Sequence, residues 1–492
     1  MFQKKPTSSE IDGIKYRRVP TWQVALGQLQ CGSGMAFYIL VGLMSYLATE
    51  GYGIALAAAG VILSATRIFD GLIDPLLAVW IDRFHSRFGK LRFMLLLGWA
   101  IRGVATLFLF VWASDGTHGA VMFIVMYMLY ILGNSIYDIA GNMVPAIMTN
   151  DPKQRPTIQV WSTVYNYLFP MIFSLVSTLV VLPMYDNKYT VPMMAMTCLI
   201  NMAGSLILVL IACIGLTPID KPENFENISA GGAQDKVSGK DMLQFLKGNR
   251  PFQMYVIAAV SDKLAQQVNS QAIVTTMLFG ILIGNIQFGS ILSMASMLPA
   301  ILFAIIGARY AGKYGNKEST ITWTWVCTAI AAASIVFCLA VDLKQIPTNI
   351  GLMVVFFSLL LLMNGAKMCV TTANGAMRAD IVDYELDRSG KYIPAIVTAT
   401  YNFIDQFVTS LGATIATGCV ALIGYVHSAP QPTDAATSAI LAVTLLLYFG
   451  MPIFGWVCTL VAMRFYKLTK SNMVEVQKSV HAKKQEALKA KG

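Results

Sequence analysis

The chain has 492 residues, of which 56% are hydrophobic and only 13% are charged. A soluble protein usually carries about 25% charged residues, so this composition excludes an ordinary soluble domain and predicts an integral membrane protein. The formal net charge of +10 does not indicate nucleic-acid binding, because the basic residues lie in short loops and tails beside apolar segments, as orientation in a membrane requires.

Twelve apolar segments follow one another along the chain. At about 1.5 Å per residue, each is long enough to cross about 30 Å of hydrocarbon as a helix. They cover residues 22–48, 53–81, 91–113, 119–149, 156–184, 191–217, 251–284, 288–311, 320–341, 350–377, 392–426 and 436–465. We therefore expect an all-α integral membrane protein with twelve transmembrane helices.

One long polar interruption divides this series in half. Residues 218–250 are rich in glycine, serine and charged residues and are predicted to form a cytoplasmic linker. The predicted domains are an N-terminal six-helix bundle over residues 1–217 and a C-terminal six-helix bundle over 251–466. A basic cytoplasmic tail follows over residues 467–492.

Basic residues are distributed unevenly between the two sides of the predicted membrane. The loop after the second span alone contains Arg83, Arg87, Lys90 and Arg92. The opposite side carries only Lys188 and Lys344, so both termini are expected in the cytoplasm, with the protein in the cell membrane. No signal peptide is expected, because the first twenty residues are polar and basic.

The second span contains a charged stripe. Arg67, Asp70 and Asp74 lie at positions i, i+3 and i+7, which share one face of a helix. A charged residue at the bilayer centre costs about 2.5–3.5 kcal/mol even on the lenient insertion scale, so the stripe should face a bundle interior or a water-filled cavity. It is interpreted either as an ion-pair staple between helices or as a cation or proton site in a transport path.

The two halves repeat a loop pattern. Residues 82–92 (DRFHSRFGKLR) follow the second span, and residues 308–318 (ARYAGKYGNKE) follow the eighth. A basic-aromatic-glycine-basic turn at this place in each half is the loop pattern of the major facilitator fold, in which two bundles rock about a site near the midplane.

Three segments carry a family resemblance over the whole chain. Residues 67–98, 137–155 and 377–403 resemble the glycoside–pentoside–hexuronide:cation symporters, the family of melibiose permease. The resemblance implies alternating-access symport of a sugar or glycoside with Na⁺ or H⁺. It implies no cofactor and no enzymatic activity, and a monomer is expected.

The resemblance places the cation site on Asp70 and Asp74, with the hydroxyl of Ser135 from the fourth span; Arg67 would compensate their charge. Asp70 and Asp74 would also be the metal ligands if Na⁺ is the coupling ion. Relatives that use Na⁺ often have an amide side chain where this chain has Ile73. The loss of an oxygen ligand should weaken Na⁺ more than H⁺, which favours H⁺.

The family's sugar-binding acid falls on Asp138 in the fourth span. An ionised carboxylate can accept strong hydrogen bonds from adjacent sugar hydroxyls. Asn134, Asp138 and Asn142 share one helical face, which is interpreted as a substrate face or as a polar face for helix packing.

Other parts of the family's sugar site do not match. The first-span acid is Gly34 here, the fifth-span arginine is Thr163, the tenth-span tryptophan is Thr371 and the eleventh-span lysine is Gln406. These departures put galactoside recognition in doubt. The chain's own candidates for binding substrate, beside Asp138 and Asn142, are Gln30, Lys367, Thr371, Tyr401, Asn402 and Gln406.

Lys367 lies deep in the tenth span and needs an anionic partner. We expect either Asp405 or a carboxylate on the substrate, such as a uronide. The polar run over residues 262–269 is interpreted as a hydrated cytoplasmic helix end, and Asp380, Asp383 and Arg388 as a cytoplasmic gate.

Two other classes of membrane protein are alternatives to a transporter. An enzyme is disfavoured, because the chain has no histidine or cysteine cluster, no serine–lysine dyad and no glycine-rich phosphate loop. A membrane channel or receptor remains as the non-transporter alternative. The eight cysteines lie in apolar segments without metal-ligand spacing and are expected to act as small hydrophobic residues.

Overall fold

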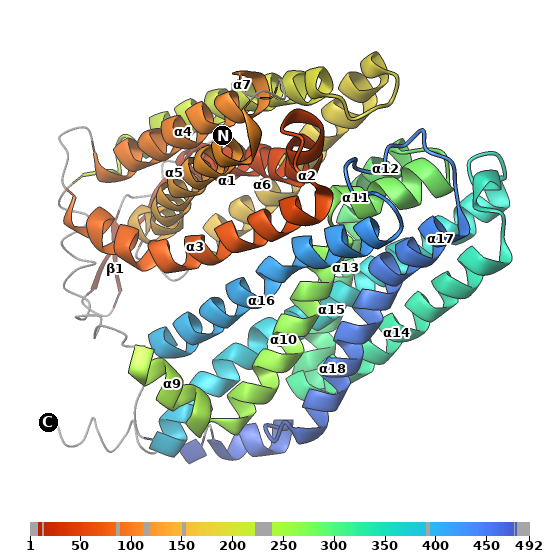
Figure 1. Ribbon diagram of the computed structural model, residues 1–492. Coiled ribbons are helices and arrows are strands. Elements are labelled where there is room, and N and C mark those ends of the chain that lie inside the picture. The colour runs from red at the N-terminus through yellow and green to blue at the C-terminus, as the bar shows by residue number, and fades with distance from the viewer. Residues whose placement is uncertain are drawn as a thin grey trace, which may run out of the picture. The chain divides into compact units, whose positions relative to one another are not determined.

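A computed structural model describes residues 8–11, 14–84, 89–112, 114, 118–149, 154–221, 239–389, 394–476 and 478–479. The chain divides into two compact units (Figure 1). Unit 1 comprises Met1–Ala233 with Gly424–Gln431, and unit 2 comprises Gln234–Ile423 with Pro432–Gly492.

Unit 1 begins with a two-stranded antiparallel hairpin and continues as helices. Its elements are β1 (Ser8–Ile11), β2 (Ile14–Arg17), α1 (Thr21–Gly42), α2 (Met44–Tyr46), η1 (Leu47–Gly51), α3 (Leu56–Arg83), α4 (Lys90–Leu107), η2 (Phe108–Trp112), α5 (Gly119–Met148), α6 (Arg155–Leu175), η3 (Val176–Val181), η4 (Leu182–Tyr185) and α7 (Val191–Leu216).

Unit 2 is helical throughout the part of it that is described. Its elements are α9 (Gly239–Gly248), α10 (Arg250–Asn269), α11 (Ala272–Thr275), η5 (Thr276–Leu282), α12 (Gln287–Ala295), α13 (Met297–Tyr314), α14 (Asn316–Ala340), η6 (Leu343–Gln345), α15 (Ile350–Ser389), α16 (Pro394–Leu422), α17 (Ser438–Leu445), η7 (Leu446–Gly450) and α18 (Met451–Phe465). Helices α10, α14, α15 and α18 run alongside one another (Figure 1).

Each of the twelve predicted spans coincides with helical structure. Nine helical stretches among the described residues are long and apolar enough to cross a membrane by length and composition. The other three spans are helical too, but α3 carries the charged stripe, α10 carries the polar run 262–269, and the eighth span divides into α12 and α13. The predicted linker contains α9 near its end, while residues 222–238 and 480–492 lie outside the described residues.

The repeated loop pattern has the same backbone conformation in both units. Gly89 precedes α4 with φ 95° and ψ 147°, and Gly315 precedes α14 with φ 104° and ψ 156°. This region of positive φ favours glycine. In unit 1 the Asp220 carboxylate accepts hydrogen bonds from the backbone N–H groups of Lys90 and Arg92, at 3.0 and 2.9 Å, and so caps the start of α4.

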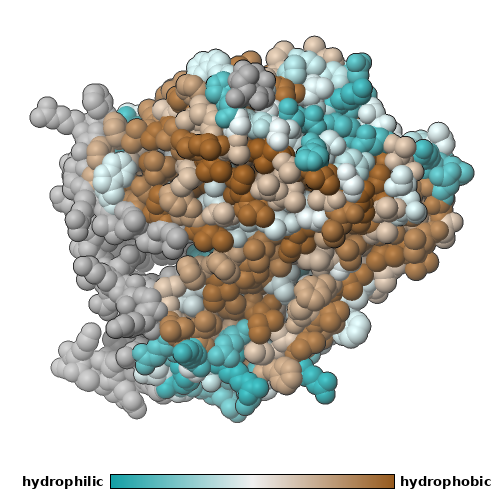
Figure 2. All heavy atoms as spheres, viewed as in Figure 1, coloured by the Kyte–Doolittle hydropathy of each residue, from teal (hydrophilic) through white to brown (hydrophobic). Residues whose placement is uncertain are grey.

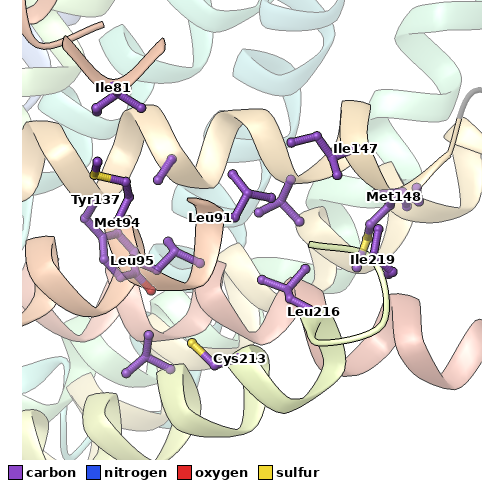
Figure 3. Packing of buried hydrophobic residues seen from close by; sticks show 14 of the residues in the cluster. Ile81, Leu91, Met94, Leu95, Tyr137, Ile147, Met148, Cys213, Leu216 and Ile219 are labelled. Carbon is purple, nitrogen blue, oxygen red and sulfur yellow. The ribbon is translucent and has the colours of Figure 1, made fainter. Parts of the chain in front are cut away.

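Helices α4 and α5 cross closely because glycines occupy the contact. A Cβ atom at Gly133 would lie 2.4 Å from the Arg102 backbone nitrogen, and one at Gly98 would lie 2.7 Å from that of Tyr137. Small residues allow this approach in membrane proteins. Leu91, Met94 and Ile147 belong to a buried apolar cluster that α7 also joins (Figure 3). The crossing brings Arg102 beside the polar face of α5.

Large apolar side chains lie on the outer faces of the helices in both units. Val121, Ile214 and Val336 are among those exposed, and Figure 2 shows hydrophobic residues along the helices in view. Such surfaces are typical of helices that face lipid tails rather than water.

Candidate functional site

The charged stripe of α3 lies beside the polar face of α5 in unit 1. Asp70 and Asp74 are both partly buried, and the Ser135 hydroxyl of α5 donates a hydrogen bond to Asp70. Asp74 interacts electrostatically with Asp70 and also lies within hydrogen-bonding reach of Ser135. Two carboxylates and one hydroxyl therefore face one another, which is a donor set of hard oxygen atoms suited to a proton or an alkali cation.

Arg67, one turn before Asp70, is partly buried and acts electrostatically on Tyr127 and Tyr130 of α5. Among the described residues, no group of three or more histidine, cysteine, aspartate or glutamate side chains is arranged to hold a metal ion.

Asp138 is exposed at mid-helix in α5, on the side that faces the α3 carboxylates. The Asn134 amide donates to Asp138 Oδ2 at 2.8 Å, and Arg102 of α4 donates to Asn134 Oδ1 at 3.2 Å. Asp70 and Asp74 act electrostatically on the Asp138 carboxylate. The predicted cation residues and the predicted sugar-binding acid thus share one polar region of unit 1.

Sequence reasoning missed Arg102. It is the only charged residue between positions 93 and 113, in the middle of the third predicted span. An ionisable residue at that depth is a functional candidate by default, so the signal was present. Its side chain is 0% exposed.

The remaining candidates in unit 1 differ in accessibility. Asn142, one turn beyond Asp138, is exposed. Gln30 is buried and donates to the Gly141 carbonyl at 3.5 Å, so its amide helps to hold α1 against α5. Gly34, where the resemblance places the family's first-span acid, lies near Tyr137: a Cβ atom built at Gly34 would be 3.7 Å from Tyr137 Cε1. Thr163 is exposed.

In unit 2 the acidic residue that acts electrostatically on Lys367 is not Asp405, one of its two expected partners. Asp262 of α10 acts on this lysine. Asp405 instead forms an ion pair with Lys263 at 2.7 Å. The two acidic residues were not distinguishable by sequence, because the choice depends on the rotation of α10 against α15 and α16.

Asp262 is 4% exposed, and both of its carboxylate oxygens accept hydrogen bonds. The Trp456 indole donates to Oδ1 at 3.0 Å, and the Gln266 amide donates to Oδ2 at 2.8 Å. The Lys367 ammonium lies 5.8 Å from the centre of a Trp456 ring. The interpretation of this run as a hydrated helix end is therefore wrong for Asp262, which lies in the interior of unit 2.

Tyr401 lies between two cations. The Arg378 guanidinium is 4.1 Å from the centre of its ring and the Lys263 ammonium is 5.2 Å away. The ring is only 2% exposed, so little of it is accessible to a substrate. The exposed candidates of this unit are Thr371 and Asn402, while Gln406 is partly buried.

At the far end of α15, the predicted gate residues have partners that the sequence did not indicate. Asp380 accepts a hydrogen bond from the Asn316 amide at 2.6 Å. Arg388 pairs with Glu385 at 2.9 Å and donates to the Gly248 carbonyl at the end of α9. Asp383 is partly buried and also has an interaction partner. Glu385, absent from the prediction, is therefore the acidic partner of Arg388.

A family model for MFS/sugar transport proteins matches residues 24–470. The chain belongs to this family. It is therefore a multi-pass membrane transporter and not an enzyme.

Three relatives resemble the chain over nearly its whole length. The inner membrane symporter YicJ of Escherichia coli K12 is 21% identical, covering 93% of this chain and 94% of its own. The isoprimeverose transporter of Lactiplantibacillus pentosus is 21% identical, covering 95% and 93%. The glucuronide carrier protein homolog of Escherichia coli K12 is 22% identical, covering 88% and 89%.

A solved structure supports the fold. The nucleoside transporter NupG aligns with a TM-score of 0.61 and 15% identity, covering 91% of this chain and 99% of that one. The protein has the major facilitator fold and belongs to a family of sugar transport proteins.

Proposed function

We propose that Asp70, Asp74 and Ser135 bind the coupling cation and that Asp138 binds sugar hydroxyls beside them. The observation that carries the proposal is the hydrogen bond from Ser135 to Asp70, which joins the α3 stripe to the helix that bears Asp138. Because the carboxylates interact electrostatically, occupancy of the cation site changes the field at the sugar-binding acid.

H⁺ is the coupling ion that this donor set favours. Ile73, between the two carboxylates, contributes no oxygen, and Na⁺ requires several oxygen ligands whereas a proton requires one carboxylate oxygen. No resident cofactor is part of the proposal. The protein works as a monomer in the cell membrane, with both termini in the cytoplasm.

A neutral sugar or glycoside is the proposed substrate. A uronide is the second candidate, supported by the similarity to the glucuronide carrier homolog. The electrostatic interaction of Lys367 with Asp262 weighs against it, because Asp262 offsets part of the positive charge that a substrate carboxylate would need.

The test uses proteoliposomes with isoprimeverose as the probe sugar. Asp70→Asn and Asp74→Asn should each abolish uphill accumulation while counterflow of labelled sugar persists. Asp342→Asn removes an exposed carboxylate from a loop and should leave accumulation unchanged. Wild-type accumulation in both site variants would overturn the assignment of the cation site. Uptake driven by a pH gradient and abolished by a protonophore would support H⁺, whereas a Na⁺ requirement at fixed pH would reverse that choice.

A further inference from the structure

Arg102 is a fully buried cation in the interior of unit 1. Its guanidinium carbon lies 4.1 Å from the centre of the Phe37 ring and 3.6 Å from that of the Tyr137 ring. Cation–π contacts of this kind stabilise a desolvated guanidinium, but they do not neutralise its charge. A buried arginine in a transmembrane bundle requires an anion nearby.

The hydrogen bonds of Arg102 lead to that anion through one amide. Nη1 donates to Asn134 Oδ1 at 3.2 Å, and Asn134 Nδ2 donates to Asp138 Oδ2 at 2.8 Å. Nε and Nη2 are buried and have no hydrogen-bond partner among the described residues. The amide can link the two charges only in this orientation, with its oxygen toward the arginine and its nitrogen toward the carboxylate.

Among the described residues, the other titratable groups that interact electrostatically with Asp138 carry no positive charge. Those that act on it are Asp70 and Asp74 of α3, Cys31 of α1, and Tyr130 and Tyr137 of α5 itself. The two α3 carboxylates disfavour an ionised Asp138, since like charges repel. Arg102 is the cation that opposes them.

We propose that Arg102 is a positioning residue that keeps Asp138 ionised and oriented through the Asn134 amide, and thereby maintains it as a hydrogen-bond acceptor for substrate hydroxyls. The last step rests on the proposed function of Asp138. The electrostatic effect of Arg102 on Asp138 does not rest on that function, because it involves only the side chains of Arg102, Asn134 and Asp138. Asp138 is exposed and can contact a ligand. Arg102 is 0% exposed and acts on Asp138 from the interior of unit 1, through the Asn134 amide.

The sign of the pH dependence follows from this arrangement. At high pH an ionised Asp138 without Arg102 is an uncompensated charge, so Arg102→Gln should destabilise the protein most there. As the pH falls, protonation of Asp138 relieves this cost and the difference from wild type should shrink. If Arg102 only fills space in the interior, Arg102→Gln should lower stability by the same amount at every pH.

The primary experiment needs no sugar. Denaturant unfolding of the full chain in detergent micelles is measured over a pH series for wild type, Arg102→Gln, Asp138→Asn and the double variant. The double variant should lose less unfolding free energy than the sum of the two single losses. The difference should correspond to a factor of about ten or more in the folding equilibrium constant. Asn134→Leu should show the same pH dependence of stability as Arg102→Gln, because it removes the amide that connects Arg102 to Asp138.

Two variants keep the test decisive if Arg102→Gln folds poorly. Arg102→Lys retains the charge and should restore the coupling to Asp138. Arg92→Gln, ten residues earlier on α4, removes an arginine that pairs with Asp220 at 3.3 Å. This control should not couple to Asp138. Additive single losses together with a pH-independent loss in Arg102→Gln would overturn the inference.

A second measurement tests the link to the substrate. Binding of isoprimeverose should weaken at low pH, and in Arg102→Gln this weakening should begin at a higher pH than in wild type. Superimposable binding profiles would overturn the role in recognition. If wild type does not bind isoprimeverose, the proposed substrate fails, and the unfolding cycle alone decides the inference about Arg102.

Discussion

The electrostatic interaction between Lys367 and Asp262 gives a quantitative test of whether the lysine is structural. Asp262 is 4% exposed, and its oxygens accept hydrogen bonds from Trp456 and Gln266. Asp262→Leu removes both hydrogen bonds and leaves Lys367 uncompensated. A hydrogen bond to a charged group contributes about 1.5–3 kcal/mol, so the loss of both bonds should lower the free energy of unfolding by about 3–6 kcal/mol.

Lys367→Met should cost less than Asp262→Leu, because the two neutral donors continue to stabilise the Asp262 carboxylate. The double change removes both charges and leaves an apolar contact. Replacing a buried pair by apolar residues is often close to neutral, so the double variant should be more stable than Asp262→Leu alone. The coupling energy should reach about 1–3 kcal/mol.

Denaturant unfolding in detergent micelles measures these free energies, and a second ion pair provides the control. Lys263 and Asp405 are 2.7 Å apart, but the lysine side chain is 48% exposed. A double-mutant cycle on Lys263 and Asp405 should give a coupling energy of about 0–1 kcal/mol. Additive losses for Lys367 and Asp262 would refute the pairing. A preference for uronates over neutral parent sugars that disappears in Lys367→Met would show instead that the lysine reads a substrate anion.

Three further predictions follow from unit 1. Asp138→Asn should weaken sugar binding about tenfold or more, since a hydrogen bond to a charged group contributes about 1.5–3 kcal/mol, and isothermal titration calorimetry would measure it. Ile73→Asn should add a Na⁺ response to uptake in proteoliposomes; unchanged uptake across a Na⁺ series would contradict this. Gly133→Ala should reduce the yield of folded protein in size-exclusion chromatography, because its Cβ would lie 2.4 Å from the Arg102 backbone, whereas Gly375→Ala, with nothing within 4 Å, should not.

The sequence predicted the architecture well, because the signals for it are local. Hydropathy over about 20 residues locates a transmembrane helix, and the glycines of the two repeated turns mark equivalent places in the two halves. The α3 stripe was likewise readable, since Arg67, Asp70 and Asp74 lie within two turns of one helix. The structure then places Ser135 against it.

Partners between helices could not be predicted in the same way. Lys367 had several acidic residues of unit 2 as possible partners, and the choice of Asp262 depends on helix rotation. The link from Arg102 to Asp138 depends on a close helix crossing at Gly133, which a single sequence does not mark. Sequence reasoning can therefore identify an intramembrane charge as costly, but the packing decides what compensates it.

The compensation found for these charges has a consequence for transport. In unit 1, Arg102 is linked to Asp138 through Asn134; in unit 2, Lys367 is compensated by Asp262. Each of these cations thus has its counter-charge within its own unit. Alternating access in this fold moves one bundle against the other as largely rigid bodies. Charges compensated within a bundle need not lose their partners during that motion, so its energy can depend on the state of the proposed cation site at Asp70 and Asp74. On this view, breaking an internal pair should reduce stability first, whereas neutralising the cation site should uncouple transport in a protein that still folds.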